Sequence, residues 1–241
     1  KRQSMLQTAL YLENSKNHAG ILDCLSVFDG VARTAEEFDV NNDLLNLQNG
    51  TLNLESFIFS PHNKADYITK ILNASFDESA KCPRFQNFLN RIFLNDAELI
   101  TFLQKWFGYM LTAKTDEQFL IFCYGTGKNG KSVLLEFLQW FFNSYCVKLP
   151  VSALMVDKNN PDRAQNEIAR IKGARFVIST ETEENQRLAE ATIKNLTGGD
   201  KLTGRFLHGR TFEFLPTHKI VTFGNHKPII RGADYGIWRQ I

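Results

Sequence analysis

Long apolar runs, paired cysteines and a large excess of one charge are all missing from this sequence of 241 residues. No apolar run approaches the roughly 20 residues that span a bilayer, so neither a membrane-spanning helix nor a membrane partner is expected. The four cysteines form no CxxC pair and have no nearby histidine set, which argues against a zinc site and a disulfide framework. A reducing, cytoplasmic compartment is the simplest expectation, in a bacterium or a cell that hosts a virus.

The net charge is small, at +2 at pH 7. Proteins that coat themselves with nucleic acid usually carry a larger excess of Lys and Arg, so any nucleic-acid contact is expected to be local. Charged residues make up 22% of the chain and apolar residues 43%, which is ordinary for a soluble globular protein. From the residues around Lys1 and Ile241, we expect this sequence to be a piece of a longer polypeptide that is truncated at its carboxyl end.

The hydrophobic pattern changes near residue 112. Before it, helical spacing follows Pro83 and recurs from Leu99 to Phe107, and Asn49-Gly50 predicts a hairpin within Asn41–Phe59. After it, strands and helices alternate. The predicted strands are Phe119–Tyr124, Arg175–Ser179, two arms around Phe206–Leu215, and Lys219–Phe223, and the predicted helices are 133–142, Arg163–Ile171 and Arg187–Leu196. We therefore predict a mostly helical domain over residues 1–111 and an α/β domain over 112–241.

The strongest motif is GTGKNGKS, which matches G-x-x-x-x-G-K-[ST] at each fixed position. Its glycines let backbone N–H groups surround phosphate oxygens, Lys131 offers a charge to the β- and γ-phosphates, and Ser132 offers a hydroxyl to Mg²⁺. The alternative is a glycine-rich turn with a chance Lys-Ser pair. We predict an ATP site with Mg²⁺, formed by Gly125, Thr126, Gly127, Lys128, Asn129, Gly130, Lys131, Ser132 and Val133.

Acidic residues follow the predicted strand that ends at Ser179. A carboxylate at a strand end beside the loop can hold the Mg²⁺ shell or polarise the attacking water. Glu181 is favoured because it lies closest to the strand end, and Glu183 is the second candidate because a two-residue step returns to the same side of an extended chain. The alternative is a solvated acidic turn.

Two further features carry candidate polar groups. Asn225 follows the last predicted strand, where an amide can orient the hydrolytic water; the alternative is a simple turn before Pro228. A predicted hairpin bears the cations, which can grip a phosphodiester backbone without reading bases or can merely keep an exposed edge soluble. The candidate DNA-binding residues are Lys201, Arg205, His208 and Arg210. Arg231 and Arg239 are candidates for a cation supplied to a neighbouring subunit's nucleotide.

In their order and spacing, these segments resemble superfamily three helicases, and within them the phage and plasmid primase-helicase family that includes the poxvirus primase-helicase. The likeness covers nearly the whole chain after about Leu44. The segments NLQNGTLNL, SPHNKADYIT, CPRFQNFLNRIF and WFGYMLT resemble the helical domain that precedes the motor. The segments GTGKNGKS, VISTETEE, IKNLTGGDKLTGRFL and VTFGNHKP resemble the motor's own motifs.

This resemblance implies an AAA+-type P-loop NTPase core in a homo-hexameric ring, with ATP between subunits and single-stranded or forked DNA through the centre. It implies that Lys131 and Ser132 bind nucleotide and Mg²⁺ and that Glu181 serves the acidic motif and the metal, with Thr182 separating it from Glu183. It also implies that Asn225 is a polar sensor and Arg239 the arginine finger. Relatives commonly carry an amino-terminal primase, which would lie upstream of Lys1.

The leading hypothesis is an ATP-dependent DNA helicase in the replication of a phage, plasmid or other mobile element. One alternative is a non-catalytic ring or DNA-loading module that uses ATP only to close. A P-loop kinase is a further alternative, which leaves the hairpin and Asn225 unexplained.

Overall fold

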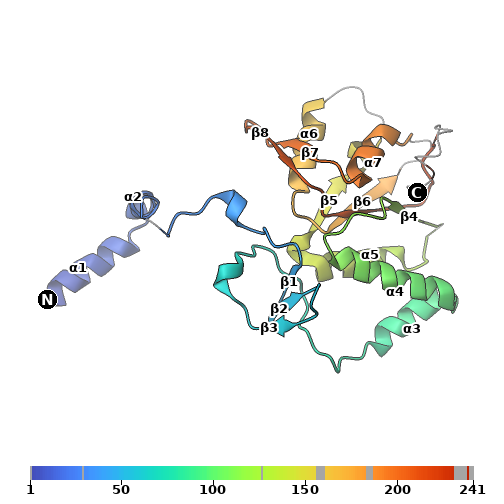
Figure 1. Cartoon of the computed structure of the whole chain (residues 1–241), viewed down its shortest axis with the longest axis horizontal. Coiled ribbons are helices and arrows are strands. Elements are labelled where there is room, and N and C mark those ends of the chain that lie inside the picture. Colours follow the sequence, from blue (N-terminus) through green and yellow to red (C-terminus); the bar gives the residue numbers. More distant parts are fainter. Residues whose placement is uncertain are drawn as a thin grey trace.

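A sheet of four parallel strands organises the computed structural model, which describes residues 2–28, 30–125, 127–155, 161–182, 187–230 and 238 (Figure 1). The strands are β4 (Leu120–Tyr124), β5 (Cys146–Pro150), β6 (Phe176–Thr182) and β9 (Lys219–Gly224). Their order across the sheet is β4-β9-β6-β5, and all neighbours are parallel. β9 therefore lies between β4, which leads into the glycine-rich loop, and β6, which leads into the acidic segment.

Side chains of the sheet alternate between two hydrophobic cores. Ile178 and Val221 point to one face, where they meet α4 (Ala97–Leu111) and α5 (Lys131–Phe142). Val177 and Ile220 point to the other face, toward α7 (Glu190–Thr197) and the end of α6 (Pro161–Arg170). Figure 1 shows α4 and α5 on one side of the sheet and α6 and α7 on the other. The predicted α/β arrangement is confirmed, and the structure adds that the central sheet is parallel.

The first part of the chain combines helices with a small antiparallel sheet. This sheet is formed by β1 (Leu44–Leu47), β2 (Gly50–Asn53) and β3 (Phe59–Ser60), so the predicted hairpin is present and gains a third strand. The helices here are α1 (Arg2–Glu13), α2 (Ser15–Leu25), α3 (Pro83–Ile92) and α4. α1 and α2 extend away from the rest of the chain (Figure 1). Within the described ranges, no helix combines the length and the apolar character needed to cross a membrane.

The two halves share a core across the predicted boundary between residues 111 and 112. Leu45 and Leu72 from the first half pack in the same cluster as Leu138, Phe142 and Phe176 from the second. The boundary itself stays a prediction. The shared packing means that the small sheet and α4 brace the face of the central sheet that carries α5.

A buried arginine ties the small sheet to the central one. Arg175, directly before β6, donates hydrogen bonds to the carbonyl oxygens of Asn42 at 2.9 Å and Leu44 at 2.8 Å, and to that of Leu111. Its guanidinium also lies 4.9 Å from the centre of the Tyr145 ring. Because a buried guanidinium without partners is costly, these contacts are expected to hold the two parts together.

A second buried cation lies beside it. The ammonium of Lys219, at the start of β9, donates to the carbonyl oxygen of Thr112 and lies 4.6 Å from the Tyr109 ring centre. Burial and the nearby charge of Arg175 lower the pKa of Lys219 to about 7. At neutral pH the folded protein therefore holds a much larger share of this lysine in its neutral form than an unfolded chain does.

The stability of the fold is expected to depend on pH through Lys219. Unfolded chains bind this proton up to the ordinary pKa of 10.5, whereas the folded protein releases it near 7, so stability should rise as pH increases between these values. Lys219→Met should reduce that rise, measured as urea midpoints at about pH 7 and about pH 9. The exposed Lys114→Met is the matched control. An identical pH dependence in Lys219→Met and the unmodified chain would contradict the assignment.

The predicted basic hairpin is present as β7 (Leu202–Arg205) and β8 (Thr211–Phe214), which pair antiparallel. Strand β7 lies tightly on α6. A Cβ placed on Gly204 would lie 2.8 Å from the Cα of Ala169, a distance that real side chains do not reach. Glycine at this position therefore lets the hairpin approach the helix backbone closely.

Candidate nucleotide site and basic hairpin

The glycine-rich loop turns sharply between β4 and α5. Gly127 and Gly130 have φ values of 100° and 81°, and Lys128 also has a positive φ of 51°. Left-handed backbone at Gly130 lets α5 begin at Lys131, so the N–H groups of its first turn, which have no acceptor within the helix, lie beside the loop. Such an arrangement of backbone donors favours an anion.

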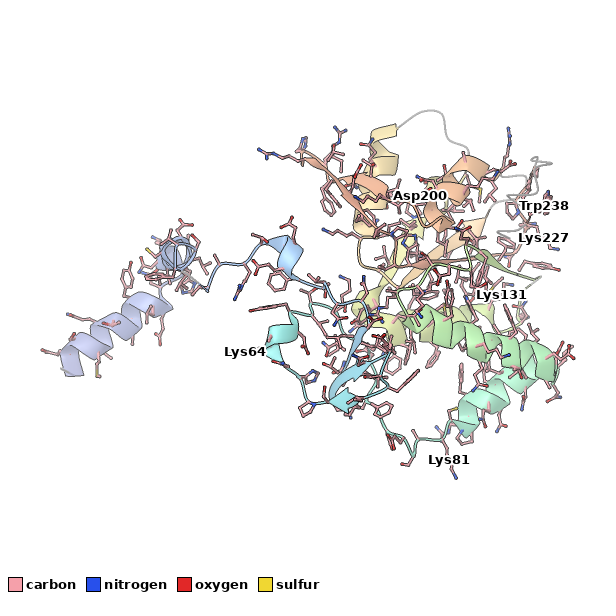
Figure 2. All side chains as sticks on the ribbon, in the orientation of Figure 1. Lys64, Lys81, Lys131, Asp200, Lys227 and Trp238 are labelled. Carbon is pink, nitrogen blue, oxygen red and sulfur yellow. The ribbon has the colours of Figure 1, made fainter. Side chains whose placement is uncertain are left out.

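Lys131 places its ammonium within the loop. Its Nζ donates to the carbonyl oxygen of Gly125 at 2.5 Å and to Oδ1 of Asn129 at 3.1 Å. Figure 2 shows this residue at the start of α5. Ser132 follows it in the first turn and is exposed. The loop thus presents a cation, a hydroxyl and a helix N-terminus within a few residues, as the sequence predicts.

α3 supports the loop from behind. A Cβ on Gly130 would lie 2.5 Å from Cγ2 of Ile92 and 3.5 Å from the Phe88 ring. Both residues belong to α3, which the sequence places more than thirty positions upstream. This close packing leaves room for glycine alone and fixes the loop against the first half of the chain.

The loop opens onto a cleft of about 480 Å³. Lys131 and Ser132 line it from α5, Thr180 from the end of β6, and Asn225 from directly after β9. Because parallel strands place their carboxyl ends at one edge of a sheet, residues distant in sequence meet here. Three of the predicted site residues, Lys131, Ser132 and Asn225, are therefore brought together.

The acidic segment begins at an irregularity in β6. Thr180 pairs with Phe223 and Thr182 pairs with Gly224, so the register shifts at Glu181 and forms a β-bulge or a similar irregularity. Bulges redirect the chain at the edges of sheets and next to functional sites. The side chain of Glu181 lies outside what the structure describes. So do residues Thr126, Glu183, Arg231 and Arg239, whose predicted roles stay predictions.

Several cleft residues were not predicted from the sequence. They are Leu135, Glu136 and Gln139 of α5, Lys148 of β5, Thr180, Phe223 and Gly224. Ser132, Leu135, Glu136 and Gln139 follow helical spacing, so one face of the helix after the loop carried a usable signal. Lys148 could not be found because β5 was not predicted. Val133 is exposed and lies outside the set that lines this cleft.

The thiol of Cys123 lies half-buried behind the loop. Burial raises its pKa to about 11, although the charge of Lys131 opposes the shift. It therefore stays protonated at neutral pH and is a poor nucleophile and metal ligand. Within the described part of the chain, no group of three His, Cys, Asp or Glu side chains is arranged to hold a metal ion.

The predicted DNA-binding residues gather on the β7–β8 hairpin. Lys201 precedes β7, Arg205 ends it, His208 lies in the turn and Arg210 precedes β8. Arg205 is half-buried and the other three are exposed. The hairpin lies on the face of the sheet that carries α6, and its four basic residues are absent from the lining of the 480 Å³ cleft.

Two protein families match parts of the chain. The family described as "D5 N terminal like" matches residues 1–94, and a "Family of unknown function (DUF5906)" matches residues 123–237. Among solved structures, the A form apo structure of the NrS-1 C terminal region has a TM-score of 0.52 at 14% identity. It covers 63% of this chain and 35% of its own. At this identity the likeness concerns the fold alone.

The chain is also similar to several viral proteins. A "Putative helicase" of Invertebrate iridescent virus 3 is 26% identical over 240 residues, or 95% of this chain and 25% of the relative. A "Putative helicase" of Acanthamoeba polyphaga mimivirus is 27% identical over 84% of this chain and 22% of the relative. A "Putative primase" of African swine fever virus is 26% identical over 86% of this chain and 22% of the relative.

These relatives are themselves named as helicases and primases, and each is similar to this chain over most of the chain's length. The chain spans about a quarter of the length of the curated relatives it matches.

Proposed function

We propose that this chain is the ATP-hydrolysing motor portion of a replication helicase, with an AAA+-type P-loop core of superfamily three. The observation that carries the proposal is the cleft in which Lys131, Ser132 and Asn225 meet at the carboxyl edge of the sheet. The names of the viral relatives support a helicase or primase rather than a small-molecule kinase.

Each cleft residue has a chemical task in this proposal. The loop N–H groups and Lys131 hold the β- and γ-phosphates, and Ser132 binds the Mg²⁺ that bridges them. Glu181 at the end of β6 supplies the carboxylate for the metal shell or the attacking water, with Glu183 as the second candidate. Asn225 directly follows β9, the strand between the loop strand β4 and the acidic strand β6, and from there an amide can reach the γ-phosphate or the water.

The remaining parts of the proposal concern partners. DNA, single-stranded or forked, binds the β7–β8 hairpin through Lys201, Arg205, His208 and Arg210. A homo-hexamer places Arg239 of one subunit at the nucleotide of the next. A primase domain belongs to the longer protein.

ATP turnover of this chain tests the proposal directly. Turnover that requires Mg²⁺ and rises with single-stranded DNA would support the motor. Phosphate transfer to a small acceptor would favour the kinase alternative, and tight ATP binding without turnover in an assembled ring would favour the ring-closing module. Particle mass with a non-hydrolysable ATP analogue measures assembly in the same sample.

Asn225→Ala is expected to lower kcat for ATP about 100-fold while KM changes little, because the amide acts on the reacting groups rather than on binding. The measurement is steady-state ATP turnover over a range of ATP concentrations. Asn90→Ala removes an exposed asparagine of α3, outside the segments that resemble the motor, and is the matched control. A rise in KM with unchanged kcat would show that Asn225 only binds nucleotide.

A further inference from the structure

The tip of the basic hairpin carries large apolar side chains as well as cations. Phe206 is 49% exposed and Leu207 is 76% exposed. The Phe206 ring stacks on Phe212 with centroids 5.5 Å apart and an angle of 29° between the rings. Phe212 in turn lies 5.9 Å from Phe214, which is buried in the core. We call these three rings the aromatic ladder; it runs from the core to the solvent.

The turn at the tip holds the ladder in place. The N–H of Gly209 donates to the carbonyl oxygen of Phe206 at 2.8 Å and closes a four-residue turn. His208 takes a positive φ of 61° within it, a conformation that costs energy for any residue except glycine. Two residues before Phe206, Gly204 of β7 lies against Ala169 of α6. Phe206 is therefore presented from a hairpin that is held at its turn and along β7.

A small number of cations lie in the hairpin or against the aromatic ladder. Lys172 lies with its ammonium 5.2 Å from the Phe212 ring centre, and the hairpin adds Lys201, Arg205 and Arg210. Two acids, Asp200 and Glu213, offset part of this charge. Counterion release from so few phosphate contacts gives limited affinity. An exposed ring within a weakly basic surface is the chemistry that recognises unpaired bases, because the ring stacks on the base while the cations meet the phosphates.

We propose that Phe206 is a base-stacking residue for single-stranded nucleic acid, backed by Phe212 and Phe214. This inference rests on the proposed function, since it concerns the strand on which the motor acts, and it adds a contact with bases to the phosphate contacts of the hairpin. Stacking accepts every base, so the contact lends affinity without sequence preference. It also depends little on salt, unlike the contacts of Arg210 and Lys201.

Binding of matched oligonucleotides to the full chain tests this inference. One probe is oligo-dT and the other is an abasic strand of equal length and charge, each labelled for fluorescence anisotropy and titrated over a salt series. The unmodified chain should bind oligo-dT more tightly. Phe206→Ala should weaken oligo-dT binding about 10-fold, leave abasic binding unchanged and keep the salt slope, whereas Phe206→Trp should retain the preference. Arg210→Ala should weaken both probes and reduce the salt slope.

Two control variants separate stacking from general apolar contact. Leu207→Ala removes a more exposed apolar side chain from the same turn, and Phe57→Ala removes a Phe that is 77% exposed outside the hairpin. Both should keep the preference for oligo-dT. The assignment would be overturned if Leu207→Ala weakened oligo-dT binding as much as Phe206→Ala does, or if Phe206→Ala kept the preference for oligo-dT over the abasic strand. It would also be overturned if the unmodified chain bound a duplex as tightly as oligo-dT.

ATP turnover measured without DNA keeps the two proposals apart. A chain that hydrolyses ATP but shows no base-dependent binding at Phe206 would refute the stacking role and leave the motor. A chain that does not hydrolyse ATP but loses oligo-dT affinity in Phe206→Ala would refute the motor and leave the stacking role. Binding of peptides or lipid vesicles in place of either oligonucleotide would refute the stacking role.

Discussion

Lys131→Ala is expected to lower ATP turnover by about 100- to 1,000-fold, because in the proposed function it removes the ammonium that holds the β- and γ-phosphates. Nζ lies 2.5 Å from the carbonyl oxygen of Gly125 and 3.1 Å from Oδ1 of Asn129, so the ammonium is already held where the loop closes. The measurement is phosphate release with saturating Mg²⁺, with and without single-stranded DNA.

The matched control is Lys81→Ala. Lys81 is exposed and lies well away from Lys131 in Figure 2, so turnover should not change. Lys131→Arg should also lower turnover although it keeps the charge, because the larger planar guanidinium does not fit a site shaped for a compact ammonium. Full activity in Lys131→Ala would refute the phosphate-loop assignment, whatever the behaviour of the control.

Much of the candidate site could be predicted because its signals are local. A run of apolar residues before GTGKNGKS and a helical pattern after it place Lys131 at a strand-to-helix turn. Asn225 likewise follows a short apolar strand directly. The structure confirms these elements, and it brings both residues to the same cleft. Their roles in catalysis stay predictions.

Other features depend on contacts between distant segments and left little trace in the sequence. β5 was missed because its five residues include Lys148 and Pro150, and lysine and proline are both uncommon in strands. Arg175 and Lys219 resemble solvated strand ends in the sequence, yet both are buried against carbonyl groups of the first half. The stacking of Phe206 on Phe212 could be seen only once the hairpin register was known.

The contact between α3 and Gly130 of the loop could not be predicted from the sequence, and the second prediction rests on it. Gly130→Ala should destabilise the fold by about 2–4 kcal/mol, combining the cost of a positive φ with overpacking against Ile92. It should also weaken nucleotide binding, since the first turn of α5 begins at this residue. Urea unfolding and titration with a fluorescent ATP analogue measure the two effects.

Two further variants separate the two causes of the destabilisation by Gly130→Ala, which are the positive φ and the overpacking against Ile92. Gly127 also has a positive φ, of 100°, but a Cβ there meets nothing within 4 Å, so Gly127→Ala should lose only the conformational part. Ile92→Ala removes the Cγ2 that a Cβ on Gly130 would approach to 2.5 Å. Residues in contact typically couple by about 0.5–3 kcal/mol, so the double variant should be less destabilised than the sum of its single changes. Strict additivity would mean that Ile92 does not confine the loop, and that the requirement for glycine comes from the backbone alone.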